Sequence, residues 1–294
     1  MKYIICIIAV ISLFSCTVDY NPDINLADVQ KQLIVNSCLS PQEKIKIEFY
    51  STFFSNDTYS YKGQSNISIL LKENGTVLYD GMCADSVFTL NYLPKVGCTY
   101  SITASVVGLS TIYAETKIPY PITCKINYKP KYGIITLQDI QQETENSSMW
   151  ITANYMIDGT VSQKFDEYMT NAVLADAVNK SNDTFFANEI LGTSYCDGFI
   201  RVKATNLLKL DSLMFSDTRP NLKSSGDYTS IRVRLCAAST DYDQYNKSYY
   251  QQTATPAESD MNAMVYQPTH IYCNIKNGLG IFAGLNESFY YIYK

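Results

Sequence analysis

The fold of this chain depends on one stretch near its C-terminus, Asn274-Ile275-Lys276-Asn277-Gly278-Leu279-Gly280-Ile281-Phe282-Ala283-Gly284. Apolar residues are interspersed there with glycines, a pattern typical of a turn whose flanks pack into a core. The glycines permit tight turns or a positive φ. A phosphate-binding loop is not expected, because the strand-loop-helix context and the lysine of a Walker motif are missing. We expect the stretch to hold the C-terminal domain closed. The candidate structural residues, for which ligand binding is the alternative role, are Asn274, Gly278, Gly280, Phe282 and Gly284.

Working outward, the stretch is followed by a predicted last strand, Phe289 to Tyr293, and preceded by the best helix candidate, Thr240 to Gln252. Ser239 or Thr240 can cap this helix. Three tyrosines lie on one predicted helix face, at spacings i, i+3 and i+7: Tyr242, Tyr245 and Tyr249. Such a stripe usually packs into a core, and a surface that stacks on sugars or peptides is the alternative.

Short strands with regular turns dominate the first part of the chain. Asn74-Gly75 between two apolar runs predicts a tight hairpin. The spacing favours an antiparallel, immunoglobulin-like β-sandwich over residues 29–120. Its predicted strands are Gln32–Cys38, Lys44–Phe49, Ile67–Leu71, Val77–Tyr79, Tyr100–Val106 and Thr111–Ile118.

The second part, residues 121–294, is predicted to be a β-rich (α+β) domain, so the whole chain is expected to be mostly β. Trp150 is expected to be a buried core anchor. Residues 165–178 fit either a helix or an extended excursion. The predicted strands are Ile122–Tyr128, Ile134–Leu137, Met149–Tyr155, Ile200–Lys203 and Ile231–Leu235.

The beginning of the chain predicts its location. Tyr3 to Phe14 is an apolar run of signal-peptide length, too short for a permanent membrane span. It ends in Leu13-Phe14-Ser15-Cys16, which resembles the lipobox of bacterial lipoproteins. The resemblance implies a signal peptide over residues 1–15, lipidation of Cys16 and a tether over residues 16–28. The protein would then be anchored to a membrane through lipid without spanning it.

The amino-acid composition narrows the classes of protein to which this chain can belong. Only 17% of residues are charged, the net charge is −5 and 46% are apolar, which argues against disorder and against nucleic-acid binding. Of nine cysteines, removing Cys6 with the signal and Cys16 as the lipid site leaves seven. These can form disulfides after export or stay buried as free thiols. No metal site or cofactor is expected, because His270 is the only histidine and no C-x-x-C pair is present.

Catalytic residues are not expected. A Ser-His-Asp triad would have to use His270, and no nucleophile elbow is present. The carboxylate pairs Asp241/Asp243 and Asp139/Glu143 are more readily explained as ordinary surface and helix-terminal acids than as a glycosidase pair.

Ser86 and Ser212 each follow an aspartate and precede an apolar residue. These short stretches resemble the O-glycosylation motif of exported Bacteroidetes proteins, so both serines are candidate modification sites. Chance recurrence of so short a motif is the alternative.

The closing stretch is similar to the N-I-x-x-G-x-G-I-F-x-G ending of a Bacteroidetes lipoprotein family catalogued as domain of unknown function 4249. Leu33-Ile34-Val35 ahead of Leu39-Ser40-Pro41 and Gly97 to Thr103 leading to Lys117-Ile118-Pro119 also resemble that family. The resemblance implies an outer-membrane protein that associates with TonB-dependent receptors, and it supplies no catalytic residue. We therefore expect a non-enzymatic protein that binds a ligand or accompanies a transporter. A structural or adhesive surface protein is the alternative, and a glycan or peptide hydrolase is third.

Overall fold

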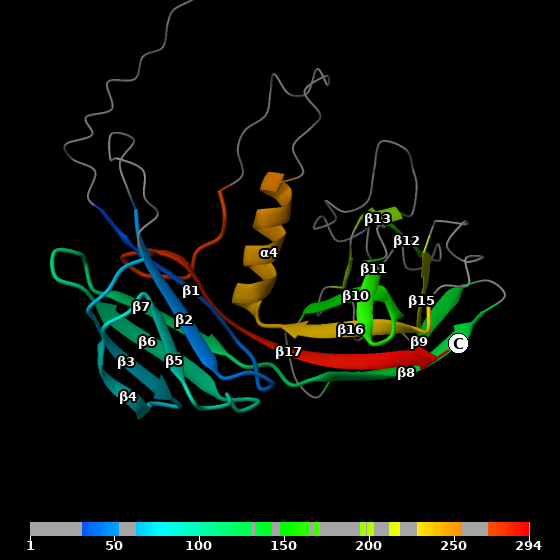
Figure 1. The fold of residues 1–294 in the computed structure, drawn as a ribbon, viewed down its shortest axis with the longest axis horizontal. Coiled ribbons are helices and arrows are strands. Elements are labelled where there is room, and N and C mark those ends of the chain that lie inside the picture. Colours follow the sequence, from blue (N-terminus) through cyan, green and yellow to red (C-terminus); the bar gives the residue numbers. More distant parts are fainter. Residues whose placement is uncertain are drawn as a thin grey trace, which may run out of the picture.

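The computed structural model describes residues 31–52, 63–130, 133–142, 148–164, 167–170, 195–197, 199–202, 212–217, 228–253 and 270–293. These residues form three β-sheets and one helix (Figure 1), which confirms the expected mostly β fold. Within them, no helix is long and apolar enough to cross a membrane. The predicted signal peptide, Cys16 and the tether lie outside the described residues.

The strands of the first part are β1 (Leu33–Leu39), β2 (Ile45–Ser51), β3 (Ile67–Glu73), β4 (Thr76–Cys83), β5 (Val87–Leu90), β6 (Thr99–Ser105) and β7 (Ile112–Lys117). The later elements are β8 (Ile122–Lys129), β9 (Ile134–Gln142), β10 (Ser148–Ile157), β11 (Thr160–Lys164), β12 (Glu167–Thr170), β13 (Tyr195–Asp197), β14 (Ile200–Val202), β15 (Ser212–Asp217), β16 (Ser230–Ala238), α4 (Thr240–Thr253) and β17 (Leu279–Tyr293).

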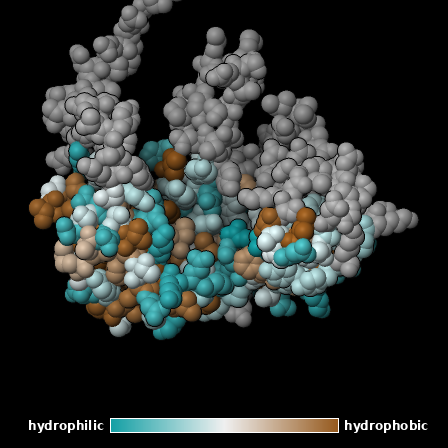
Figure 2. Space-filling view, in the orientation of Figure 1, coloured by the Kyte–Doolittle hydropathy of each residue, from teal (hydrophilic) through white to brown (hydrophobic). Residues whose placement is uncertain are grey.

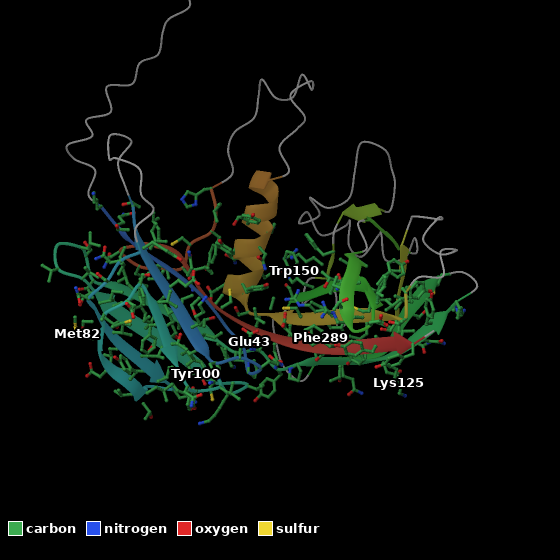
Figure 3. All side chains as sticks on the ribbon, viewed as in Figure 1. Glu43, Met82, Tyr100, Lys125, Trp150 and Phe289 are labelled. Atoms are coloured by element: carbon green, nitrogen blue, oxygen red, sulfur yellow. The ribbon has the colours of Figure 1, made fainter. Side chains whose placement is uncertain are left out.

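The N-terminal strands form two sheets around one core. The four-stranded sheet has the order β4-β3-β6-β7, and β1, β2 and β5 lie next to one another in the eight-stranded sheet. Burial alternates along β1, β2, β3 and β6 because every second side chain enters the core. Phe49 and Tyr100, the latter labelled in Figure 3, are among its largest fully buried side chains. The outer surface seen in Figure 2 mixes hydrophobic residues with hydrophilic ones over this sandwich.

The hairpin between β3 and β4 has the predicted turn. Asn74 and Gly75 both have positive φ, 47° and 82°, as a type I′ turn requires. Asn74 Oδ1 also accepts a hydrogen bond from the Thr99 amide at 2.9 Å, which ties the turn to β6. The Asn-Gly signal therefore determined both the turn and the register of this hairpin.

The C-terminal strands enclose a second core. Its large sheet carries the order β11-β10-β16-β17, with β14 also paired to β10, and it faces a sheet of order β13-β12-β15-β9-β8. The core between these sheets contains Ile151, Val233 and Phe215. Trp150 is buried as predicted, at 5% exposure, but it points to the other face of β10, where it packs against Phe199 and Cys236.

The last strand is the main departure from the sequence-based expectation. We predicted a strand from Phe289, but β17 begins at Leu279 and runs for 15 residues, about 50 Å at the usual rise per residue. Its first part pairs in parallel with β1, and from Leu285 on it pairs antiparallel with β16. One continuous strand therefore connects the two parts of the molecule (Figure 1).

This pairing corrects the assignment of the glycine-bearing stretch to the C-terminal domain. Ile275 and Phe282 are buried in the N-terminal core, at 5% and 0% exposure, together with residues of β1, β2, β3 and β6. The predicted division at residue 121 separates this stretch from the sandwich that it completes. Phe282 is buried as expected, but it belongs to the other core.

Glycines are required here chiefly because backbones approach closely. A Cβ on Gly278 would lie 2.7 Å from the Leu33 carbonyl oxygen, and one on Gly284 would lie 2.4 Å from that of Lys117. Gly280 has φ +102°, and a Cβ there would lie 2.1 Å from the Val35 carbonyl oxygen. The predicted positive φ is therefore found only at Gly280, whereas the other two glycines of the stretch provide room for neighbouring strands.

Candidate functional site

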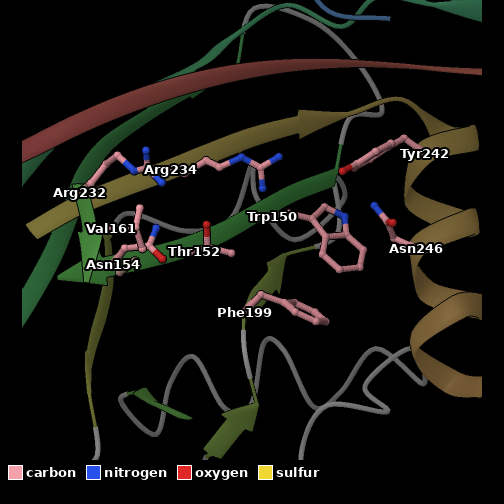
Figure 4. A pocket seen from close by; sticks show the side chains of 10 residues that line it. Trp150, Thr152, Asn154, Val161, Phe199, Arg232, Arg234, Tyr242 and Asn246 are labelled. Atoms are coloured by element: carbon pink, nitrogen blue, oxygen red, sulfur yellow. The ribbon is translucent and has the colours of Figure 1, made fainter. Parts of the chain in front are cut away.

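A pocket of about 300 Å³ lies where α4 meets the outer face of the eight-stranded sheet (Figure 4). Side chains alternate between the faces of a strand, so this face carries the residues of β10 and β16 that do not enter the core. Residues from both strands, from β11 and from α4 meet in the pocket with Phe199, which directly precedes β14. They are Trp150, Thr152, Ala153, Asn154, Val161, Phe199, Arg232, Arg234, Tyr242 and Asn246.

Two aromatic rings form one wall of the pocket. Trp150 and Phe199 are 5% and 4% exposed, and their ring centroids are 4.6 Å apart at an interplanar angle of 38°. The Trp150 indole Nε1 donates a hydrogen bond to Asp243 Oδ1 at 2.8 Å. The wall is therefore held both by packing and by a bond to the helix.

A buried ion pair attaches helix α4 to the sheet. Arg201 Nε donates to Asp243 Oδ1 at 2.7 Å, and both residues are 7% exposed. Ser239 caps the helix as predicted, because its Oγ accepts from the Tyr242 amide at 3.2 Å. The same Oγ accepts from the Gly284 amide at 3.2 Å, which attaches the helix start to β17. These bonds place Tyr242 and Asn246 at the rim of the pocket.

The predicted tyrosine stripe is only in part a core stripe. Tyr242 packs against Trp150 and its neighbours, whereas Tyr249 is 44% exposed. The buried positions of the helix are polar, Asp243 and Ser248. The hydrophobic spacing failed because an ion pair and hydrogen bonds, rather than an apolar seam, attach this helix.

The two arginines of the pocket have different surroundings. Arg234 forms an ion pair with Glu287 of β17. Arg232 lies over the Phe289 ring, 5.5 Å from its centroid, and its enclosed Nε has no hydrogen-bond partner within the part of the chain that the structure describes. A covered donor without an acceptor is costly, so this N–H favours a ligand that brings an oxygen to it.

The pocket is positively charged at neutral pH. Burial raises the pKa of Tyr242 to about 12, so the phenol stays protonated and neutral. Burial also raises the pKa of the nearby Cys236 thiol to about 12. Among the described residues, the charged groups at the pocket are thus Arg232, Arg234 and Glu287, which leaves one positive charge in excess, because the charges of Arg201 and Asp243 behind Trp150 cancel.

The candidate residues of the closing stretch do not line this pocket. Gly278, Gly280, Phe282 and Gly284 lie along or just before the part of β17 that completes the sandwich. Asn274 bonds to the backbone of that strand. Their contacts are structural, and ligand binding by them receives no support from the pocket geometry.

The carboxylates considered for hydrolysis are occupied in other contacts. Asp241 accepts from the Tyr272 hydroxyl at 2.9 Å and from Thr116 at 3.3 Å, whereas Asp243 binds Arg201 and Trp150. Asp139 forms an exposed ion pair with Lys125 at 2.7 Å. Glu143 lies outside the described residues.

His270 is exposed, and no described contact brings it to the pocket. Ser86 and Ser212 are half-buried, and their glycosylation remains a prediction. Within the described part of the chain, no three His, Cys, Asp or Glu side chains gather to hold a metal ion. Six cysteines are described as free thiols, so they do not form the disulfides considered above: Cys38, Cys83, Cys98, Cys124, Cys236 and Cys273.

Sequence reasoning identified the strands of the pocket but not the pocket. The alternation Ile231-Arg232-Val233-Arg234-Leu235 already places two arginines on one face of a strand that should be buried on the other. That was the available signal. The partners of these arginines come from β10, β17 and α4, and no local pattern specifies that these elements meet.

The fold and the pocket define a two-part β protein whose last strand is shared by both parts and whose helix closes a small, basic, aromatic pocket. The chain belongs to the family described as Domain of unknown function (DUF4249), which matches residues 17–290. The family that the closing stretch predicted is thereby confirmed.

Solved structures offer only a distant likeness. The chain is similar to a structure titled "Cytokine receptor complex - Crystal form 1A" at 8% identity, covering 70% of this chain and 84% of that one with a TM-score of 0.26. For "Cytokine receptor complex - Crystal form 2" the identity is 10%, the coverage 69% and 90%, and the TM-score 0.26. No curated protein matches the chain.

Proposed function

We propose that this chain is a non-enzymatic outer-membrane lipoprotein of the Bacteroidetes type, anchored through lipid, and that it binds a small ligand. The observation that carries the proposal is the pocket between α4 and the sheet, where the covered Arg232 Nε has no acceptor among the residues that the structure describes. Pockets with apolar walls and a few convergent polar groups are the usual form of ligand sites.

A binding role fits the chemistry of the pocket better than a catalytic one. The described residues that line it include no carboxylate, histidine, serine or cysteine. The arginines, amides and aromatic rings can hold and orient a ligand, but they offer neither a general base nor a nucleophile. Of the acids beside the pocket, Glu287 is paired with Arg234, and Asp243 is held by Arg201 and Trp150.

The anchor part of the proposal is supported by the lipobox-like Leu13-Phe14-Ser15-Cys16. In this proposal the N-terminal sandwich is immunoglobulin-like and separates the pocket from the membrane. A TonB-dependent receptor is the proposed partner, to which the protein would deliver its ligand. Replacing Cys16 by alanine should abolish lipidation and leave uncut precursor, as measured by metabolic labelling with a fatty acid. Normal acylation of the Cys16→Ala protein would exclude this anchor.

Ligand binding is tested on the full-length protein extracted from membranes in mild detergent. Small molecules that copurify are released by denaturation and identified by mass spectrometry. Thr152→Trp should fill the pocket and remove them, whereas Thr89→Trp, on an exposed position of β5, should retain them. Equal retention by both variants would place the ligand elsewhere. A receptor should copurify with the parent protein, and its absence would exclude the accessory role.

A structural or adhesive role is the second candidate, because β17 exposes Tyr291 and Tyr293 at 50% and 77%. Polymerisation in mild detergent that is lost on replacing both tyrosines by serine would favour it. Strictly monomeric behaviour would count against it.

A further inference from the structure

We propose that the pocket binds an acidic sugar, that is, a sugar ring carrying a carboxylate or sulfate, and that neighbouring sugars lie along the exposed aromatic residues of β17. This inference rests on the proposed function and specifies its ligand class. Three features of the described residues support it: an unmatched cation, polar groups suited to hydroxyls, and ring faces suited to sugar C–H groups.

The cation is Arg232. Its partner Phe289 supplies no charge, and none of the described ion pairs involves it. Its guanidinium can bind an oxyanion through two parallel N–H donors. Arg234 is the next residue of β16 on the same face, and Glu287 already neutralises its charge. Figure 4 shows the two arginines next to each other along β16, and Arg232 is the one whose charge is left for an oxyanion.

Hydroxyl groups are matched by the adjacent polar side chains. Thr152 and Asn154 follow Trp150 on the same face of β10, and Asn246 reaches the pocket from α4 on the Trp150 side (Figure 4). Asn154 is only 4% exposed, and no hydrogen bond of its side chain occurs within the described parts of the chain. An amide offers both donors and an acceptor, which is what a sugar hydroxyl requires.

The aromatic residues of β17 continue the same face beyond the pocket. Arg232 pairs directly with Tyr291 and Arg234 with Phe289, and directly paired residues of antiparallel strands share a face. Phe289, Tyr291 and Tyr293 are 42%, 50% and 77% exposed. Tyr291 and Tyr293 stack at 6.5 Å, so their rings form a continuous strip that starts at Arg232.

Other ligand classes use only part of this arrangement. A neutral sugar leaves Arg232 without a counter-charge, and an aromatic acid offers no hydroxyl to the amide of Asn154. A volume of about 300 Å³ is at the small end of ligand pockets, which suits one or two sugar rings. An acidic sugar combines a fixed anion, several hydroxyls and a C–H face in that size.

The test is isothermal titration calorimetry on the full-length protein in detergent, with galacturonate trisaccharide as the carboxylate probe and its fully methyl-esterified form as a neutral control of nearly the same shape. A sulfated galactose trisaccharide forms the second arm and distinguishes the two oxyanions. We expect one acidic probe to bind at least about tenfold more tightly than its neutral counterpart. Arg232→Gln should remove that preference, and Arg232→Lys should retain part of it. Tyr291→Ser should lower the affinity for the trisaccharide but not the affinity for the corresponding monosaccharide.

Lys125→Gln is the matched control, since it removes an exposed cation on β8 and should change nothing. Equal affinity for the charged and neutral probes, or insensitivity to Arg232→Gln, would overturn the acidic-sugar inference. Absence of binding by every acidic probe would overturn it as well. A copurifying ligand of another class that depends on Thr152 would leave the proposed function standing, whereas no pocket-dependent ligand at all would end both.

Discussion

Asn274 takes the place of a neighbouring strand for Phe282. Its amide Nδ2 donates to the Phe282 carbonyl at 2.7 Å, and its Oδ1 accepts from the Phe282 amide at 3.0 Å. A single side chain thus satisfies both backbone groups of a fully buried residue in the strand that connects the two parts of the molecule. This relationship explains why an asparagine stands eight positions before the phenylalanine in the closing stretch.

Replacing Asn274 by alanine should lower the free energy of unfolding by about 2–4 kcal/mol, because two partly buried backbone groups lose their partners. Urea denaturation followed by circular dichroism measures this. Asn127→Ala, at an exposed position of β8, should change stability by less than about 0.5 kcal/mol. Similar losses for the two variants would mean that the bonds to Phe282 contribute little.

Phe282→Ala should cost about 3–5 kcal/mol, and the damage should appear in the N-terminal sandwich. Hydrogen exchange should accelerate first in β1, β2 and β6, whose residues surround the ring. Phe289→Ala on the same strand is the control, since that ring is 42% exposed. Exchange that accelerates mainly in β10 and β16 would instead indicate that Phe282 stabilises the C-terminal core.

Gly280→Ala should destabilise the fold far more than Gly108→Ala. Both glycines have positive φ, +102° and +84°, but a Cβ on Gly108 meets nothing within 4 Å, whereas one on Gly280 would lie 2.1 Å from the Val35 carbonyl oxygen. Conformational strain alone should cost about 1–2 kcal/mol at each site. The additional loss at Gly280 measures the cost of separating β1 from β17. Equal melting temperatures for the two variants would show that the close approach of β1 adds no destabilisation at Gly280.

The buried pair between Arg201 and Asp243 should be more sensitive to losing one charge than to losing both. Asp243→Asn leaves the arginine charge uncompensated and should cost about 3–5 kcal/mol. Combining it with Arg201→Met should recover part of that loss, because the asparagine oxygen can still accept from Trp150. Fluorescence of Trp150, the only tryptophan, reports the local change. A double variant less stable than Asp243→Asn would contradict this account.

Acid should weaken the N-terminal sandwich through Glu73. Burial opposes ionisation of this carboxyl, but hydrogen bonds from Tyr100, Tyr92 and Lys95 outweigh it and lower its pKa below the ordinary value of 4.5. The folded state therefore favours the ionised form. That contribution is present above pH 4.5 and is lost as the pH falls through the folded-state pKa.

Glu73→Gln should consequently lower the melting temperature at pH 6 and flatten its decrease below pH 4.5. Glu43→Gln, with an exposed side chain close to β2, is the matched control and should leave the pH profile unchanged. The same steep acid transition in the Glu73→Gln protein would assign the acid sensitivity to other carboxyls.

The local features of this protein could be predicted from its sequence because each depends on neighbouring residues. Alternating apolar residues predicted strands such as β2 and β16, Asn74-Gly75 predicted the hairpin and Ser239 the helix cap, and all of these are present in the structure. Each of them needs only backbone geometry and one or two adjacent side chains. The pattern of the closing stretch likewise predicted that Phe282 is buried. The strands β5, β11, β12, β13 and β15 were not predicted.

Tertiary structure decided which partners these elements meet. Whether Phe282 enters the first or the second core depends on the parallel pairing of β17 with β1, two segments about 240 residues apart in the sequence. The pocket depends on the same long-range pairing, because Arg232, Phe289 and Asn246 belong to three elements that only the folded sheet brings together. Local sequence specifies the conformation of a segment and the side that is apolar, but the choice of partner is set by the packing of the whole chain, which no short pattern contains.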